Sequence, residues 1–105
     1  MSTILVLCTC PDEAAADRIA GALVEERLAA CVNRLVGVVS TYRWEGEVRR
    51  GNESLLLIKT TVERFAALRE RIVALHPYEL PEVIAVDVVR GLPSYLDWIA
   101  AETRP

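Results

Sequence analysis

The sequence contains a single histidine, His76, and a single lysine, Lys59, every other basic side chain being an arginine. One imidazole cannot form a histidine-rich metal cluster, and the chain has no glycine-rich loop of the kind that cradles phosphate. No Ser/His/Asp set matches the motifs of known hydrolases. We therefore predict that the protein is not an enzyme, and we assign no catalytic residue.

Long hydrophobic runs and a basic excess are also missing. No apolar stretch approaches the ~18 residues that a membrane-spanning helix needs. The first apolar stretch, ILVLC, lacks a preceding basic segment and a small-residue cleavage site, so we do not expect a signal peptide. A net charge of −3 with only short arginine clusters argues against nucleic acid. We expect a cytoplasmic protein with neither a membrane nor a nucleic acid as partner.

The cysteines do not have the spacing of a disulfide framework. There are three of them, Cys8, Cys10 and Cys31. In an extended segment Cys8 and Cys10 place their side chains on one face. Their Cα atoms would then lie near or beyond the roughly 7 Å limit for a disulfide. We expect reduced thiols, as in a reducing compartment.

Hydrophobic patterning predicts one domain over residues 1–105, since this length suits a single core. The expected elements are a strand at 3–9, a helix through 14–28 capped by Thr9 or Cys10, a long or broken strand in 29–50, a strand at 53–60, a helix that Pro77 stops at His76, a strand at 82–89 and a helix at 91–103. This βαββαβ order with a C-terminal helix is that of the ferredoxin-like α+β fold, with an antiparallel sheet.

The sequence also predicts three local features: a turn, a bulge and a helix cap. The turn before the third strand is expected at RGN (50–52), with Glu45-Gly46 as the less favoured alternative. Gly37 is expected to mark a bulge in the long strand. Thr60 and Glu63 have the spacing of a capping box for the second helix.

The predicted strands are apolar on both faces. In ILVLC, in LLLI (55–58) and in VIAVDVV (83–89), both sets of alternate positions are hydrophobic, apart from Asp87. Such a strand is covered on both sides. The C-terminal helix is too short to cover a sheet, so we predict an oligomer whose sheet faces pack between subunits. The alternative is a monomer whose terminal helix folds under the sheet.

His76 is the most distinctive candidate for a site. It stands in HPYELPE (76–82), between a helix end and two prolines. A histidine at a helix C-terminus is commonly a cap that interacts with the helix dipole. The alternative is a ligand for metal, for which Cys8 and Cys10 are soft donors. Thiolates with imidazole would favour copper or zinc over magnesium or calcium.

Lys59 closes an apolar strand, where a charge needs a partner or a path to water. It either reaches solvent at the strand end, or lies at a subunit boundary and pairs with Glu79, Glu82 or an anionic ligand. Aromatic residues of the types that line interfaces occur at two places: Tyr42 and Trp44 on one face of a strand, and Tyr95 and Trp98 on the last helix.

Six motifs together resemble the CutA family of divalent-cation tolerance proteins. They are VLCTCPDE, LAACVN, SxYxWEG (40–46), LLLIKTT, HPYELPE and YLDWI, and the match runs from about residue 4 to residue 100. The resemblance implies a ferredoxin-like homotrimer similar to the PII signalling proteins, with clefts between subunits. It also implies a role in tolerance of copper and other divalent ions.

The resemblance implies a metal site at Cys8 and His76, to which we add Cys10 as a substitute donor. Leu75 stands where metal-binding relatives have a second histidine, so a donor is lost. The residues that match the family's intersubunit cleft are Cys31, Trp44, Lys59, Tyr78, Glu79, Glu82, Tyr95 and Trp98.

The sequence thus leads to one main hypothesis and two alternatives. The main one is a non-catalytic homotrimer of copper tolerance that binds a divalent metal ion weakly at an intersubunit cleft and needs no obligatory cofactor. The alternatives are a PII-like sensor of a small anionic ligand and a trimeric scaffold for an unidentified protein partner.

Overall fold

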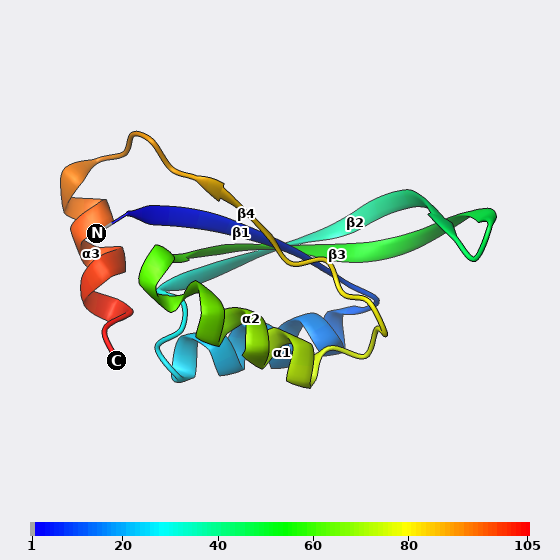
Figure 1. The fold of residues 1–105 in the computed structure, drawn as a ribbon, viewed down its shortest axis with the longest axis horizontal. Coiled ribbons are helices and arrows are strands. Elements are labelled where there is room, and N and C mark those ends of the chain that lie inside the picture. Colours follow the sequence, from blue (N-terminus) through cyan, green and yellow to red (C-terminus); the bar gives the residue numbers. More distant parts are fainter. Residues whose placement is uncertain (1) are drawn as a thin grey trace.

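A computed structural model describes residues 2–105. Its elements are β1 (Thr3–Cys10), α1 (Glu13–Glu25), β2 (Cys31–Trp44), β3 (Glu47–Thr61), the 3-10 helix η1 (Val62–Arg64), α2 (Phe65–Leu75), β4 (Ile84–Asp87) and α3 (Pro93–Glu102). The sheet has the order β2-β3-β1-β4, and all neighbouring strands are antiparallel. Helices α1 and α2 lie side by side on one face, and α3 stands at one end (Figure 1). The predicted ferredoxin-like α+β fold is confirmed.

The core lies between the sheet and helices α1 and α2. Alternate residues of β1 and β3 point toward these helices because side chains in a strand alternate between faces. The buried residues that form this core include Ile4, Val6, Cys8, Cys10, Leu56 and Ile58 from the strands, and Ile19, Leu23, Leu68 and Ile72 from the helices. The two cysteines are therefore part of the hydrophobic interior.

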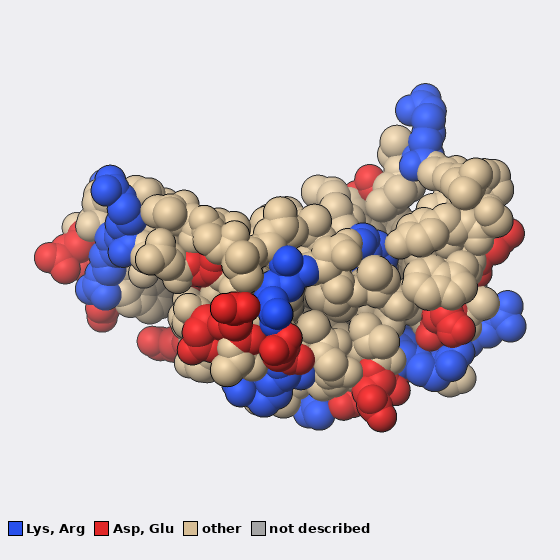
Figure 2. All heavy atoms as spheres, turned by 180° about the vertical axis from the view of Figure 1, so that it is seen from behind, with Lys and Arg blue, Asp and Glu red and all other residues tan. Residues whose placement is uncertain are grey.

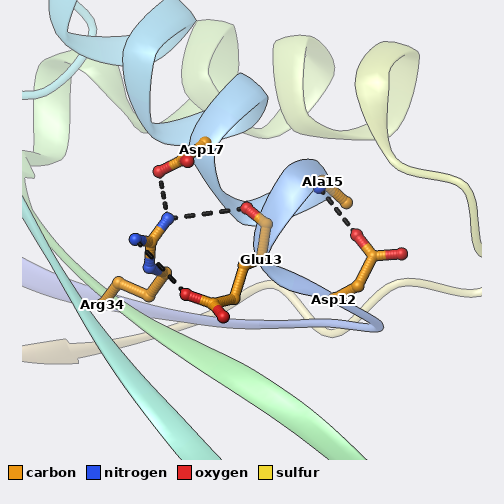
Figure 3. A network of polar contacts seen from close by, with 5 residues as sticks. All are labelled: Asp12, Glu13, Ala15, Asp17 and Arg34. Atoms are coloured by element: carbon orange, nitrogen blue, oxygen red, sulfur yellow. Dashed lines mark hydrogen bonds and ion pairs between the residues drawn. The ribbon is translucent and has the colours of Figure 1, made fainter.

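Helix α1 begins beyond the predicted caps. Its N-cap is Asp12, whose Oδ1 accepts a hydrogen bond of 2.8 Å from the amide of Ala15. The prediction of Thr9 or Cys10 is wrong because β1 continues through Cys10. Arg34 of β2 joins the first two turns of the helix to the sheet through ion pairs with Glu13 and Asp17 (Figure 3).

The turn between β2 and β3 lies at Glu45-Gly46, the alternative that the sequence favoured less. Both residues have positive φ, 52° and 79°, as in the two-residue turns whose twist matches that of the flanking strands. The expected turn at 50–52 is wrong, because Arg50 and Gly51 pair with Thr41 and Ser40 inside the sheet.

The β2–β3 hairpin extends beyond the rest of the molecule (Figure 1). β1 pairs with β3 only from Ser54 to Thr61, so the outer half of the hairpin has no neighbouring strand. A register shift between Leu35 and Val38 contains Gly37, whose φ is 78°. The predicted bulge at Gly37 is confirmed.

Helix α2 ends as predicted but starts differently. His76 is its C-cap with an extended backbone, φ −76° and ψ 135°, because a residue before proline avoids the α region. The predicted capping box is wrong: the hydroxyl of Thr60 donates to the carbonyl of Leu28 at 2.7 Å. The 3-10 helix η1 therefore precedes α2, and α2 starts at Phe65.

Strand β4 is shorter than the predicted 82–89. It covers Ile84–Asp87 and pairs with Ile4–Leu7 of β1. One further backbone bond joins the amide of Val88 to the carbonyl of Thr3 at 3.1 Å, after which the chain leaves the sheet. The segment before β4 is thus a loop that runs from the end of α2 to the sheet edge.

The sheet face opposite α1 and α2, called here the open face, is mostly apolar. Ile84 and Val86 are 54% and 49% exposed on it. Its other members include Leu5, Leu7, Leu35, Leu55 and Leu57, as the strand registers show. Charged side chains lie mainly on the helical side and at the two ends, while the hollowed upper side is largely free of them (Figure 2).

Among residues 2–105, no helix is long and apolar enough to cross a membrane.

Candidate functional site

Cys8, Cys10 and His76 come together at the end of the sheet where β1 stops. Their donor atoms all lie within 4.8 Å of one another. The two cysteines point from β1 toward the helices and are wholly buried, and His76 is 8% exposed at the end of α2. No disulfide joins any of the described cysteines. The structure thus brings together the three residues that the sequence suggested as metal ligands.

The imidazole of His76 is held at both ring nitrogens. Nε2 lies 2.8 Å from the carbonyl oxygen of Thr9, to which it donates, and Nδ1 accepts from the amide of Tyr78 at 3.1 Å. These bonds fix the orientation of the imidazole between β1 and the α2–β4 loop. His76 therefore also has the structural role of a helix C-cap tied to the sheet.

The thiols of Cys8 and Cys10 are not equivalent. The interaction with the neighbouring Cys10 thiol, together with burial, raises the pKa of Cys8, and the carboxylates of Glu82 and Glu53 raise it further. The same interaction lowers the pKa of Cys10.

The donor chemistry of this cluster fits a soft or borderline metal ion. Sulfur and imidazole ligands suit copper and zinc, whereas magnesium and calcium prefer oxygen. Cys8, Cys10 and His76 would hold the ion. A bound ion would link β1 to the end of α2.

A cleft lies beside this cluster on the open face, between the outer half of the hairpin and the α2–β4 loop. Its volume is about 670 Å³. It gathers four residues of the predicted intersubunit cleft, Trp44, Tyr78, Glu79 and Glu82. The remaining lining residues are Thr9, Ser40, Thr41, Tyr42, Arg49, Glu53, Pro77 and Leu80.

Tyr78 is the residue that joins the cluster to the cleft. Its ring lies 4.7 Å from the imidazole of His76, and its hydroxyl donates to Glu53 Oε2 at 2.7 Å. Desolvation and the bond to this carboxylate raise the pKa of Tyr78 well above its ordinary value. The phenol therefore stays neutral as a hydrogen-bond donor.

The other four predicted cleft residues lie elsewhere in the chain. Cys31 and Lys59 are directly opposed on β2 and β3, with Lys59 Nζ 3.7 Å from Cys31 Sγ. Lys59 also donates to Asn33. Within the part of the chain described, the contacts of this cation are thus with its β2 neighbours, and a pairing with Glu79 or Glu82 at a subunit boundary requires a second copy of the chain.

Tyr95 and Trp98 lie on α3, the helix that stands at the other end of the sheet (Figure 1). Their ring centroids are 5.6 Å apart. They reach the cleft only if a second copy of the chain supplies them.

Glu53 and Arg49 are cleft residues that the sequence did not predict, and Tyr42 was expected only as an aromatic of the kind that lines interfaces. The signal that identifies them is the strand register, which depends on the turn. With the turn at Glu45-Gly46, Tyr42 pairs with Arg49 and Val38 pairs with Glu53. With the turn at 50–52 these residues would not be paired in this way, so their position in the cleft could not be predicted.

Comparisons with known proteins identify the family. Residues 4–102 match the family model of the CutA1 divalent ion tolerance protein. The divalent-cation tolerance protein CutA of Thermus thermophilus is 54% identical over 99 residues, covering 94% of this chain and 96% of the relative. The chloroplastic protein CutA 1 of rice (Oryza sativa) is 44% identical over 102 residues, covering 97% of this chain, which spans only 58% of that longer relative.

Solved structures show the same fold. The divalent cation tolerance protein Cut A1 of Thermus thermophilus superimposes with a TM-score of 0.95 at 52% identity, over 97% of this chain and 99% of that one. CutA from Xylella fastidiosa gives a TM-score of 0.96 at 51% identity, over 99% and 100%. The chain belongs to the CutA1 family of divalent ion tolerance proteins.

Proposed function

We propose that the protein is a non-catalytic homotrimer of copper and divalent-cation tolerance that binds a metal ion weakly. The observation that carries the proposal is the convergence of two thiols and one imidazole, with donor atoms within 4.8 Å. The family's name supports the link to cation tolerance.

Weak binding is expected from the hydrogen bonds of His76. Whichever ring nitrogen binds the ion gives up a bond, either to Thr9 or to Tyr78. Losing one such bond costs about 1 kcal/mol, more where the freed group stays buried. Leu75 also supplies no second imidazole.

The trimer is supported by the open face. Large apolar side chains such as Ile84 and Val86 are about half exposed there in the single chain. Soluble monomers seldom expose a continuous apolar patch beyond a few hundred Å². In a PII-like trimer, a second copy covers this face and closes the cleft between subunits, where its Tyr95 and Trp98 meet Trp44 and Tyr78.

Copper titration of the purified protein tests the metal site. The variants Cys8→Ser and His76→Ala should weaken binding, and Cys31→Ser, a thiol outside the cluster, should bind as the wild type does. Equal binding by all four proteins would show that these are not the ligands.

Native mass spectrometry tests the trimer. The wild type should give three copies of the 11.6 kDa chain. Val86→Glu puts a charge on the open face and should dissociate the assembly, whereas Val73→Glu, at a similarly exposed position on α2, should not. A stable monomeric wild type would overturn the trimer.

The alternative of a sensor for a small anion has less support. The cleft has the carboxylates of Glu53, Glu79 and Glu82 in its lining, and Lys59 is not part of it. A trimeric scaffold for a protein partner remains the other alternative, and affinity capture with metal-free protein separates it from metal binding. We also propose a cytoplasmic location.

A further inference from the structure

The buried cluster has a composition that selects among metal ions. We propose that Cys8, Cys10 and His76 form a closed three-donor site for monovalent copper, Cu⁺, rather than for a divalent ion. This inference rests on the metal site proposed above and adds the charge of the ion and the part played by Cys10.

The donors of the cluster are soft. Two of the three are sulfur atoms, and thiolate ligands select Cu⁺, zinc and iron–sulfur clusters. Divalent copper prefers square-planar or tetragonal sets of nitrogen and oxygen. The cluster contains one nitrogen donor, from His76, and no carboxylate within its 4.8 Å span.

The number of donors separates Cu⁺ from zinc. Among the described His, Cys, Asp and Glu side chains, the cluster has three members and no fourth. Structural zinc takes four protein ligands, and zinc with three keeps a water molecule. Cys8 and Cys10 are wholly buried in the hydrophobic core, which offers no solvent to complete a fourth position. Three donors in a dry site suit an ion that accepts low coordination.

The distances between the donor atoms are close to those that an ion needs. With metal–sulfur and metal–nitrogen bonds of about 2.3 and 2.0 Å, as known for zinc, three donors around a trigonal ion are about 3.7–4.0 Å apart. The atoms here lie within 4.8 Å. Side-chain rotations that move them by roughly 1 Å close the site without moving the strand.

The backbone explains why the three donors meet. Cys8 and Cys10 share a face of β1, and the residue between them, Thr9, holds the imidazole of His76 through its carbonyl oxygen at 2.8 Å. The histidine is thereby anchored beside both sulfur atoms. Without Cys10 only Cys8 and His76 remain, so Cys10 is the residue on which three-fold coordination depends.

The test is an anaerobic titration of the reduced protein with Cu⁺, in competition with a Cu⁺-specific chromophoric chelator. Zn²⁺ and Cu²⁺ are titrated separately. We expect one Cu⁺ per chain, bound more tightly than Zn²⁺. Cys10→Ser should lower the Cu⁺ affinity at least tenfold, and Cys31→Ser should leave it unchanged.

X-ray absorption at the copper edge of the wild type gives a second measurement that needs no variant. Two sulfur atoms and one nitrogen around the ion would support the site, and any set with fewer than two sulfur atoms would overturn it. Binding of Zn²⁺ or Cu²⁺ that requires Cys8 and His76 but not Cys10 would refute this inference and leave the proposed function intact. A protein that binds none of the three ions would refute both.

Discussion

The imidazole of His76 lies 2.8 Å from the carbonyl oxygen of Thr9, a residue 67 positions earlier in the chain. Its other nitrogen accepts the amide of Tyr78. One side chain thus joins the end of α2, the end of β1 and the loop that lines the cleft. The buried thiols and the cleft are both in contact with this side chain. A substitution or a bound ion at the thiols should therefore alter the structure of the cleft, and a change in the cleft should alter the thiol site.

Replacing His76 should destabilise the metal-free protein. His76→Ala removes both hydrogen bonds and leaves a hole in a buried position, for which we expect a loss of about 1–3 kcal/mol in the free energy of unfolding. Urea denaturation in the presence of a chelator measures it. Val73→Ala, on the exposed side of the same helix, is the control; an equal loss in both variants would contradict the structural role of His76.

Metal binding should loosen the loop after α2. Nδ1 accepts the amide of Tyr78 through its electron pair while Nε2 donates to Thr9, so we expect the ion to bind at Nδ1 and displace that amide. Silver(I), a redox-stable monovalent probe, should then speed hydrogen exchange at the Tyr78 amide. The amide of Ala30, which donates to the carbonyl of Lys59, should not change. Protection of Tyr78 that survives full occupancy would exclude coordination through Nδ1.

The turn at Glu45-Gly46 should be sensitive to a side chain. Gly46 has a φ of 79°, a conformation that costs an L-residue roughly 1 kcal/mol, so Gly46→Ala should lower stability by that amount. Gly51, on β3 of the same hairpin, has open space around its Cα and no positive φ, so Gly51→Ala is the matched control. Thermal denaturation compares the two, and equal midpoints would place the turn elsewhere.

Stability should fall in alkaline solution because of Tyr78. Its pKa is raised in the folded protein by desolvation and by the bond to Glu53. A raised pKa gives stability that is fully present below the unfolded value of about 10 and is lost as the pH rises above it. Urea denaturation between pH 8 and about 11 should show this decline.

Tyr78→Phe removes the titrating phenol and should flatten that part of the pH profile. Tyr95→Phe removes a phenol at the other end of the sheet and is the control. If the profiles of the wild type and Tyr78→Phe fall in parallel, the bond between Tyr78 and Glu53 does not matter for stability.

Local patterns predicted the features that depend on neighbouring residues. Alternation placed Cys8 and Cys10 on one face of β1, and Pro77 fixed the end of α2 at His76. The order of elements then sufficed for the ferredoxin-like fold. These features follow from strand periodicity and from the restricted backbone before proline.

Features that depend on distant contacts could not be obtained in this way. RGN at 50–52 has stronger turn residues than Glu45-Gly46, yet pairing with β2 keeps it in a strand. Thr60 looks like a helix cap, but its hydroxyl is used by the carbonyl of Leu28. The bond from Tyr78 to Glu53 depends on the register of the hairpin, which was misplaced with the turn.

Cys31 differs from the other cysteines because it alone is partly accessible, on the face that we propose a sister chain covers. A maleimide dye should therefore discriminate among the thiols without any mutagenesis. Dissociated chains would take up one label each, whereas assembled ones would resist it. The wild-type protein thus carries a built-in chemical reporter of its own association.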